Sequence, residues 1–142
     1  MAGFKFRLEQ VLRYRKQLED QAKMAFAKAQ TDLAVEVEKL VKLNNSLAEQ
    51  KSLPYINNEE FWLRENFIRS LKEDIAEAEL NKSRLELLVE RRRHELIKAS
   101  QERQLLDKLK EKQAERYLHE QYLKEQINLN EIATIRYKAE AV

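Results

Sequence analysis

The chain has 142 residues, 37% of them charged, with 27 Lys and Arg against 25 Asp and Glu. Its single Gly and single Pro cannot supply the turns of a β-sandwich, a barrel or a βαβ fold, or the glycines of a phosphate-binding loop. The absence of Cys excludes disulfides, thiolate metal sites and cysteine nucleophiles. The remaining composition, rich in Ala, Glu, Lys, Leu, Arg and Gln, is typical of long helices and coiled coils.

The charges are nearly balanced, and the net charge of +2 gives no electrostatic reason to expect nucleic acid or an anionic membrane as the main partner. Lys5, Arg7 and Glu9 leave no room for the apolar core of a signal peptide. No stretch approaches the roughly 18 uncharged residues of a transmembrane helix. We therefore expect a soluble intracellular protein.

The first predicted helix covers residues 4–50. Its apolar residues recur at intervals of mostly three and four, which predicts the seam of a coiled coil. The series consists of Phe4, Leu8, Val11, Leu18, Ala22, Ala25, Ala29, Leu33, Val37, Leu40 and Leu47.

One break in the helical pattern is predicted, at the only proline of the chain, Pro54. Proline cannot lie inside a helix, and it biases the preceding residue away from helical angles. The next helix has Asn57 as a suitable N-cap, and Glu60 follows three residues later as in a capping box. Ile56 and Phe61 occupy the two positions of a hydrophobic staple.

The second predicted helix covers residues 58–140, after a turn at residues 51–57. Its apolar series matches that of the first helix, so we predict an all-α fold in which one domain forms an antiparallel coiled-coil hairpin. The series consists of Phe61, Ile68, Leu71, Ile75, Ala78, Leu85, Val89, Leu96, Ala99 and Leu106.

The second helix is predicted to extend beyond the first. A turn centred near residue 55 places Phe26 opposite Leu85 and Phe4 opposite Leu106, so that residues 107–140 overhang. Because exposed apolar stripes are usually interaction surfaces, we expect the overhang to bind a partner. Fraying of the overhang, or its pairing with a second copy, are the alternatives.

Catalysis and nucleic-acid binding find little support. The run Arg91–His94 surrounds a helix rather than lining one groove, because successive residues point about 100° apart, and Glu90 and Glu95 flank it. A solvated face is therefore expected, with RNA binding as the weaker alternative.

His94 and His119 are 25 positions apart, too far to share a metal or a proton. We expect no catalytic, cofactor-binding or metal site.

Three large side chains near the turn fall away from the seam of the second helix. Trp62 and Leu63 lie outside its apolar face, and Phe67 lies at the edge. Exposed aromatic side chains at the end of a hairpin are candidate binding anchors. Alternatively, they cover the turn by packing on Tyr55 and Ile56.

Two segments resemble the FliJ family of flagellar export proteins. The opening FKFRLEQVLRYRKQLEDQAKMAFAKAQ (Phe4–Gln30) resembles the family's aromatic and basic start, which leads into an LxxVLxYRKxxE-like segment. The closing NLNEIATIRYKAE (Asn128–Glu140) resembles the family's LDEIAxxRY segment, with Asn130 where Asp is usual.

The resemblance implies a specific role. FliJ proteins are similar to the central γ stalk of rotary ATP synthases; they insert into the ring of the export ATPase FliI, promote its assembly, link it to the export-gate protein FlhA and handle empty export chaperones. The resemblance thus implies a cytoplasmic protein, peripheral to the inner membrane at the flagellar base. A homodimerising structural coiled coil, or the stalk of another secretion or rotary ATPase, are the alternatives.

Two groups of residues are expected to carry this role. Contacts with the ATPase ring are expected from the overhang, at Leu123, Ile127, Glu131, Ile132, Ile135, Arg136 and Tyr137, and four of these (Glu131, Ile132, Arg136 and Tyr137) match the closing motif. Contacts with the export gate are expected at Trp62, Leu63, Phe67 and Leu71, of which Phe67 and Leu71 match the family's gate-binding positions.

Overall fold

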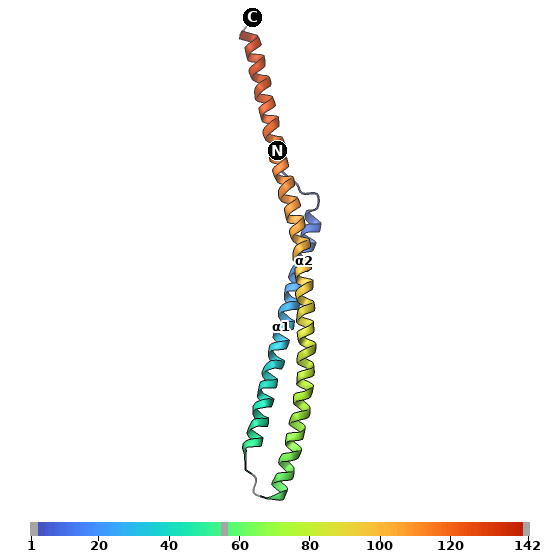
Figure 1. Ribbon diagram of the computed structural model, residues 1–142. Coiled ribbons are helices and arrows are strands. Elements are labelled where there is room, and N and C mark those ends of the chain that lie inside the picture. The colour runs from blue at the N-terminus through green and yellow to red at the C-terminus, as the bar shows by residue number, and fades with distance from the viewer. Residues whose placement is uncertain (1–2, 55–56, 141–142) are drawn as a thin grey trace. The chain divides into compact units, whose positions relative to one another are not determined.

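The computed structural model describes residues 3–54 and 57–140, and within them the chain forms two helices, α1 (Glu9–Ser52) and α2 (Asn58–Glu140). The helices pack against each other as a helical hairpin, with no strand in these ranges (Figure 1). The predicted all-α hairpin is therefore confirmed. The chain divides into two compact units: the turn unit is Glu19–Lys98, and the end unit combines Met1–Leu18 with Ala99–Val142.

The core of the turn unit is a seam of small and branched apolar side chains. Ala29 of α1 is buried, as are Ile68, Leu71, Ile75, Ala78 and Val89 of α2. All five α2 residues belong to the apolar series predicted for the second helix. Each fully buried large aliphatic side chain contributes roughly 1.5–3 kcal/mol, so this seam stabilises the paired helices.

The start of α2 is capped as its sequence predicts. The Oδ1 of Asn57 accepts a hydrogen bond of 2.8 Å from the backbone N–H of Glu60, which satisfies one of the unpaired amides of the first turn. Ile56, expected to complete a hydrophobic staple with Phe61, lies outside the described residues.

The pairing of the two helices in the turn unit differs from the expected register. The ring of Phe26 lies 5.8 Å from the guanidinium carbon of Arg93, two helical turns beyond Leu85. The reason lies at the turn, where Arg64 donates hydrogen bonds to the carbonyl oxygens of Leu53 and Pro54, the latter over 2.6 Å. The connection between the helices therefore lies beside the first two turns of α2, and α1 pairs with α2 only beyond those turns.

In the end unit the chain enters α1 later than expected. Residues 3–8 are not helical, and α1 begins at Glu9. Phe6 is buried, and the ring of Phe4 lies 5.8 Å from that of Tyr117, rather than against Leu106. On a helix, side chains two residues apart would point to nearly opposite sides. Because residues 3–8 are not helical, the rings of Phe4 and Phe6 can both pack within the end unit.

The seam of α1 also follows a different phase near its start. Leu12 is 0% exposed, whereas Val11, the expected seam residue, is 42% exposed. Counting back from Ala22 in steps of three and four reaches Glu19, Arg15 and Leu12, so the seam continues through two charged residues.

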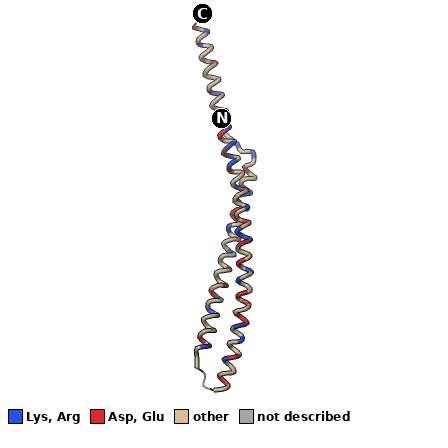
Figure 2. Tube along the Cα trace, in the orientation of Figure 1, with Lys and Arg blue, Asp and Glu red and all other residues tan. Residues whose placement is uncertain are grey.

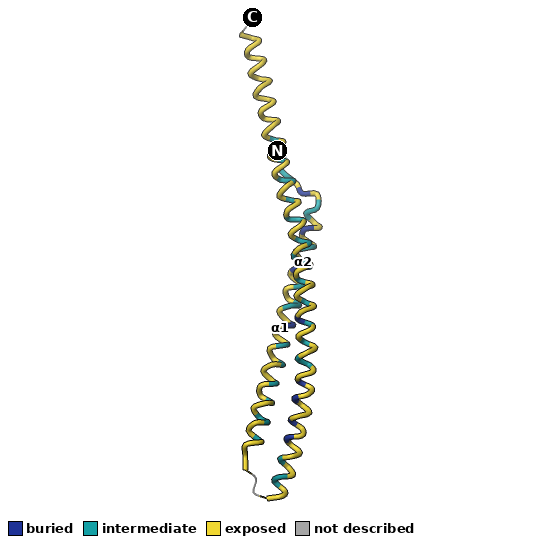
Figure 3. Tube along the Cα trace, in the orientation of Figure 1, coloured by how far each residue is buried: buried dark blue, intermediate teal, exposed yellow. Residues whose placement is uncertain are grey.

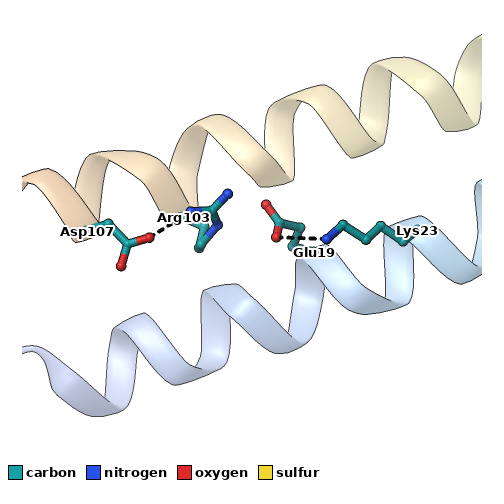
Figure 4. Close-up of polar contacts among 4 residues, drawn as sticks. All are labelled: Glu19, Lys23, Arg103 and Asp107. Carbon is teal, nitrogen blue, oxygen red and sulfur yellow. Dashed lines mark hydrogen bonds and ion pairs between the residues drawn. The ribbon is translucent and has the colours of Figure 1, made fainter.

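Charged groups at these seam positions are neutralised within the chain. Glu19 is buried, with its carboxylate 3.5 Å from the Nζ of Lys23 one turn along α1. On α2, Arg103 pairs with Asp107 over 2.7 Å (Figure 4). In the end unit, Arg15 donates to the Oε2 of Glu102 over 2.7 Å. A seam can hold such groups because each charge has a partner.

Candidate partner-binding surfaces

The C-terminal end of α2 forms the most exposed apolar surface of the end unit. Half-buried positions continue along α2 as far as Gln121, and every residue from 122 to 140 is exposed (Figure 3). The unpaired part, which we call the C-terminal segment (residues 122–140), therefore begins beyond residue 107, because residues 3–8 run along α2 as far as Tyr117.

All seven residues expected to contact the ATPase ring lie in the C-terminal segment, and all are exposed. The segment also exposes Tyr122 and Leu129, which the expected set omits. Ile127 and Leu129 are two residues apart, so they point to nearly opposite sides of the helix. The directions between these two sides are taken by the side chains of Ile132, Ile135 and Tyr137. Apolar side chains therefore project on every side of the segment, between polar and charged ones, and a surface helix with one buried face does not show this distribution. It favours a helix that other protein encloses.

A second exposed apolar surface lies at the turn, in the turn unit. Trp62 and Leu63 are 64% and 71% exposed, and Phe67 is 47% exposed. A shallow hollow lies beside them, lined by Leu53, Leu63 and Phe67 together with Gln50, Glu60 and Arg64. We call Leu53, Trp62, Leu63 and Phe67 the turn patch. Tyr55 and Ile56, the alternative packing partners of these side chains, lie outside the described residues.

The fourth residue expected to contact the gate is placed differently. Leu71 is 6% exposed and belongs to the seam of the turn unit, next to Ile68 and Ile75. Only Trp62, Leu63 and Phe67 of that set therefore reach solvent. Leu71 instead supports the helix from which Phe67 projects, one turn away.

The basic run on α2 is neutralised locally rather than gathered into a patch. Arg92 pairs with Glu95 over 2.9 Å, and Arg93 pairs with Glu90 over 3.2 Å. The guanidinium of Arg93 also lies over the ring of Phe26. These contacts support the expectation of a solvated face.

Two kinds of feature are absent from the part of the chain that the structure describes. Over residues 3–54 and 57–140, no group of three or more His, Cys, Asp or Glu side chains is placed to hold a metal ion. In the same ranges, neither helix contains a stretch long and apolar enough to cross a membrane.

Comparison with known proteins decides the family. The sequence model described as Flagellar FliJ protein matches residues 4–141, nearly the whole chain. The chain belongs to the FliJ family. No curated protein and no solved structure was found to match it significantly. As a FliJ protein it is a flagellar export component, and FliJ is not a family of enzymes. The family match also spans both candidate surfaces, the C-terminal segment and the turn patch.

Proposed function

We propose that the chain acts as the stalk of the flagellar export ATPase, with its C-terminal segment inserted into the ATPase ring, where it promotes ring assembly. The observation that carries this proposal is the distribution of exposed apolar side chains around every side of that segment. A helix of this kind gains most by being enclosed, because a partner on one side would leave the other apolar side chains in water. The function would be mechanical, at the flagellar base beside the inner membrane.

The turn patch supports a second contact, with the export gate, at Trp62, Leu63 and Phe67. Large aromatic side chains that are exposed next to a hollow are the usual anchors of protein interfaces. Phe67→Ala should weaken binding to the purified gate protein while leaving helicity unchanged. Leu71→Ala should lower the unfolding temperature, because its side chain is buried. Loss of helicity in Phe67→Ala would instead make Phe67 a residue of the core.

The stalk proposal is tested by titrating the purified chain into the export ATPase of the same organism while following ATP hydrolysis and ring assembly together. Stimulation that saturates below one copy of the chain per ATPase subunit is the expected result. An Ile132→Asp variant should lose the stimulation, since it places a charge on the apolar surface of the C-terminal segment.

Leu87→Asp is the matched control, because Leu87 is also an exposed residue of α2 but lies in the turn unit. The Leu87→Asp variant should stimulate ATP hydrolysis as much as the unmodified chain does. Absence of stimulation and of co-assembly by the unmodified chain would contradict the stalk proposal. Concentration-dependent dimerisation through the C-terminal segment would favour a self-associating coiled coil.

A further inference from the structure

The middle of the C-terminal segment is almost free of charge. Residues 126–135 read QINLNEIATI, in which Glu131 is the one charged residue. Neutral residues predominate over this end of α2 in Figure 2, whereas acidic and basic residues alternate along the paired part of the helix. The side chain of Thr134 adds little polarity, because its hydroxyl donates to the carbonyl oxygen of Asn130 over 2.8 Å.

Glu131 has no cation of its own. Its helical neighbours three and four residues away are Ile127, Asn128, Thr134 and Ile135, none of them basic. Elsewhere in the described chain, several glutamates lie beside a basic side chain, as Glu90 does beside Arg93. A shallow hollow on the segment is lined by Glu131 together with Ile127, Asn130, Thr134 and Ile135. The carboxylate therefore stands within an apolar surface.

An apolar surface that becomes enclosed takes this carboxylate out of water with it. Removing an unpaired carboxylate from water is costly, and proteins offset that cost by pairing it with a cation and hydrogen bonds. We propose, on the basis of the stalk function above, that the socket which encloses residues 126–135 is apolar and carries an Arg or Lys side chain opposite Glu131. Glu131 would thereby fix the depth and rotation of α2 in the socket, since one paired charge specifies register.

Residues 126–135 of a second copy do not meet this requirement. Residues 126–135 contain no Lys or Arg, so an isologous contact of the segment with itself would bury two copies of Glu131 and no cation. The occupant we argue for is therefore the export ATPase, which would supply both the apolar wall and the positive charge. Self-association of the chain that weakens in Glu131→Gln would instead indicate a shifted pairing of two copies through the flanking Lys124, Arg136 or Lys138, and would overturn the proposal.

The test uses the full chain, the purified export ATPase of the same organism and three substitutions. Glu131→Gln removes the charge, Glu131→Lys reverses it and Glu131→Leu extends the apolar surface. With a cation in the socket, Glu131→Gln weakens binding by about ten-fold, and Glu131→Leu and Glu131→Lys weaken it further, because the cation is left unpaired. Without a cation, Glu131→Leu binds as tightly as the unmodified chain or more tightly, and that result would overturn the proposal.

Glu120→Gln is the matched control, because Glu120 is exposed on α2 before the C-terminal segment and has Arg116 and Lys124 one turn to either side. It should bind within about two-fold of the unmodified chain, because removing an exposed surface charge has a small effect. Circular dichroism should show equal helicity in every variant. Failure of the unmodified chain to bind the ATPase would contradict the stalk function itself, whereas tight binding by Glu131→Leu would contradict only the paired charge.

Discussion

The Nζ of Lys110 lies 2.8 Å from the Oε2 of Glu9, and this ion pair joins the first turn of α1 to α2 in the end unit. The hydrogen bond from Lys110 holds the pKa of Glu9 below its usual value, and the charges of Lys110, Arg13 and Lys16 act in the same direction, while partial burial opposes them. The residues that precede Glu9 include Phe4 and Phe6, so the pair also helps to hold the N-terminal segment on α2.

The pairing should depend on pH with a definite sign. Because the folded pKa of Glu9 lies below its usual 4.5, the pair stabilises the fold above about pH 4.5 and loses its effect as the pH falls through the lower folded pKa. Amide exchange in the first two turns of α1 should therefore be faster in Glu9→Gln than in the unmodified chain near neutral pH. The two proteins should become equal in acid. A difference that persists in acid would contradict this role.

The seam phase at the start of α1 predicts opposite outcomes for two adjacent residues. Leu12→Ala should lower the free energy of unfolding by roughly 3 kcal/mol, because Leu12 is 0% exposed and its truncation leaves a cavity. Val11→Ala should cost less than about 1 kcal/mol, because Val11 is 42% exposed. Denaturant unfolding measures both. If Val11→Ala were the more destabilising of the two substitutions, Val11 rather than Leu12 would be the buried seam residue.

The two hydrogen bonds of the Arg64 guanidinium predict that lysine is a poor replacement at this position. Its two terminal nitrogens donate separately to the carbonyl oxygens of Leu53 and Pro54, and a single ammonium cannot reproduce that geometry. Arg64→Lys and Arg64→Ala should therefore both speed amide exchange in the first two turns of α2, each with a loss of about 1 kcal/mol. Full protection in Arg64→Lys would show that charge alone suffices.

Much of the fold is accessible from sequence, because composition and periodicity report which side of a helix is buried. Most of the predicted α2 series between Ile68 and Val89 is buried, and Asn57 caps α2 as its type predicts. The register is not accessible in this way. The register depends on how many residues form the connection between the helices. That number depends in part on the hydrogen bonds from Arg64 to the connection, and polar contacts of this kind leave no trace in the apolar periodicity.

The seam of α1 was difficult to predict for a related reason. Apolar periodicity favours Val11 and Leu18, but the helix keeps a regular spacing through Arg15 and Glu19, and an ion pair with Glu102 makes Arg15 acceptable there. Of the candidate surfaces, the exposed side chains of the turn patch could be predicted from the helical wheel. The burial of Leu71 follows from the same wheel, although its match to a family motif suggests a contact role.

Enclosure of the C-terminal segment by the ATPase ring is tested by comparing Ile127→Asp with Leu129→Asp in binding to the export ATPase. These exposed residues point to nearly opposite sides of the C-terminal segment. If the segment is enclosed by the ring, both variants should lose binding, each by at least about ten-fold, since each buries a charge in an apolar wall. If only one variant loses binding, the segment docks through a single face and is not enclosed by the ring.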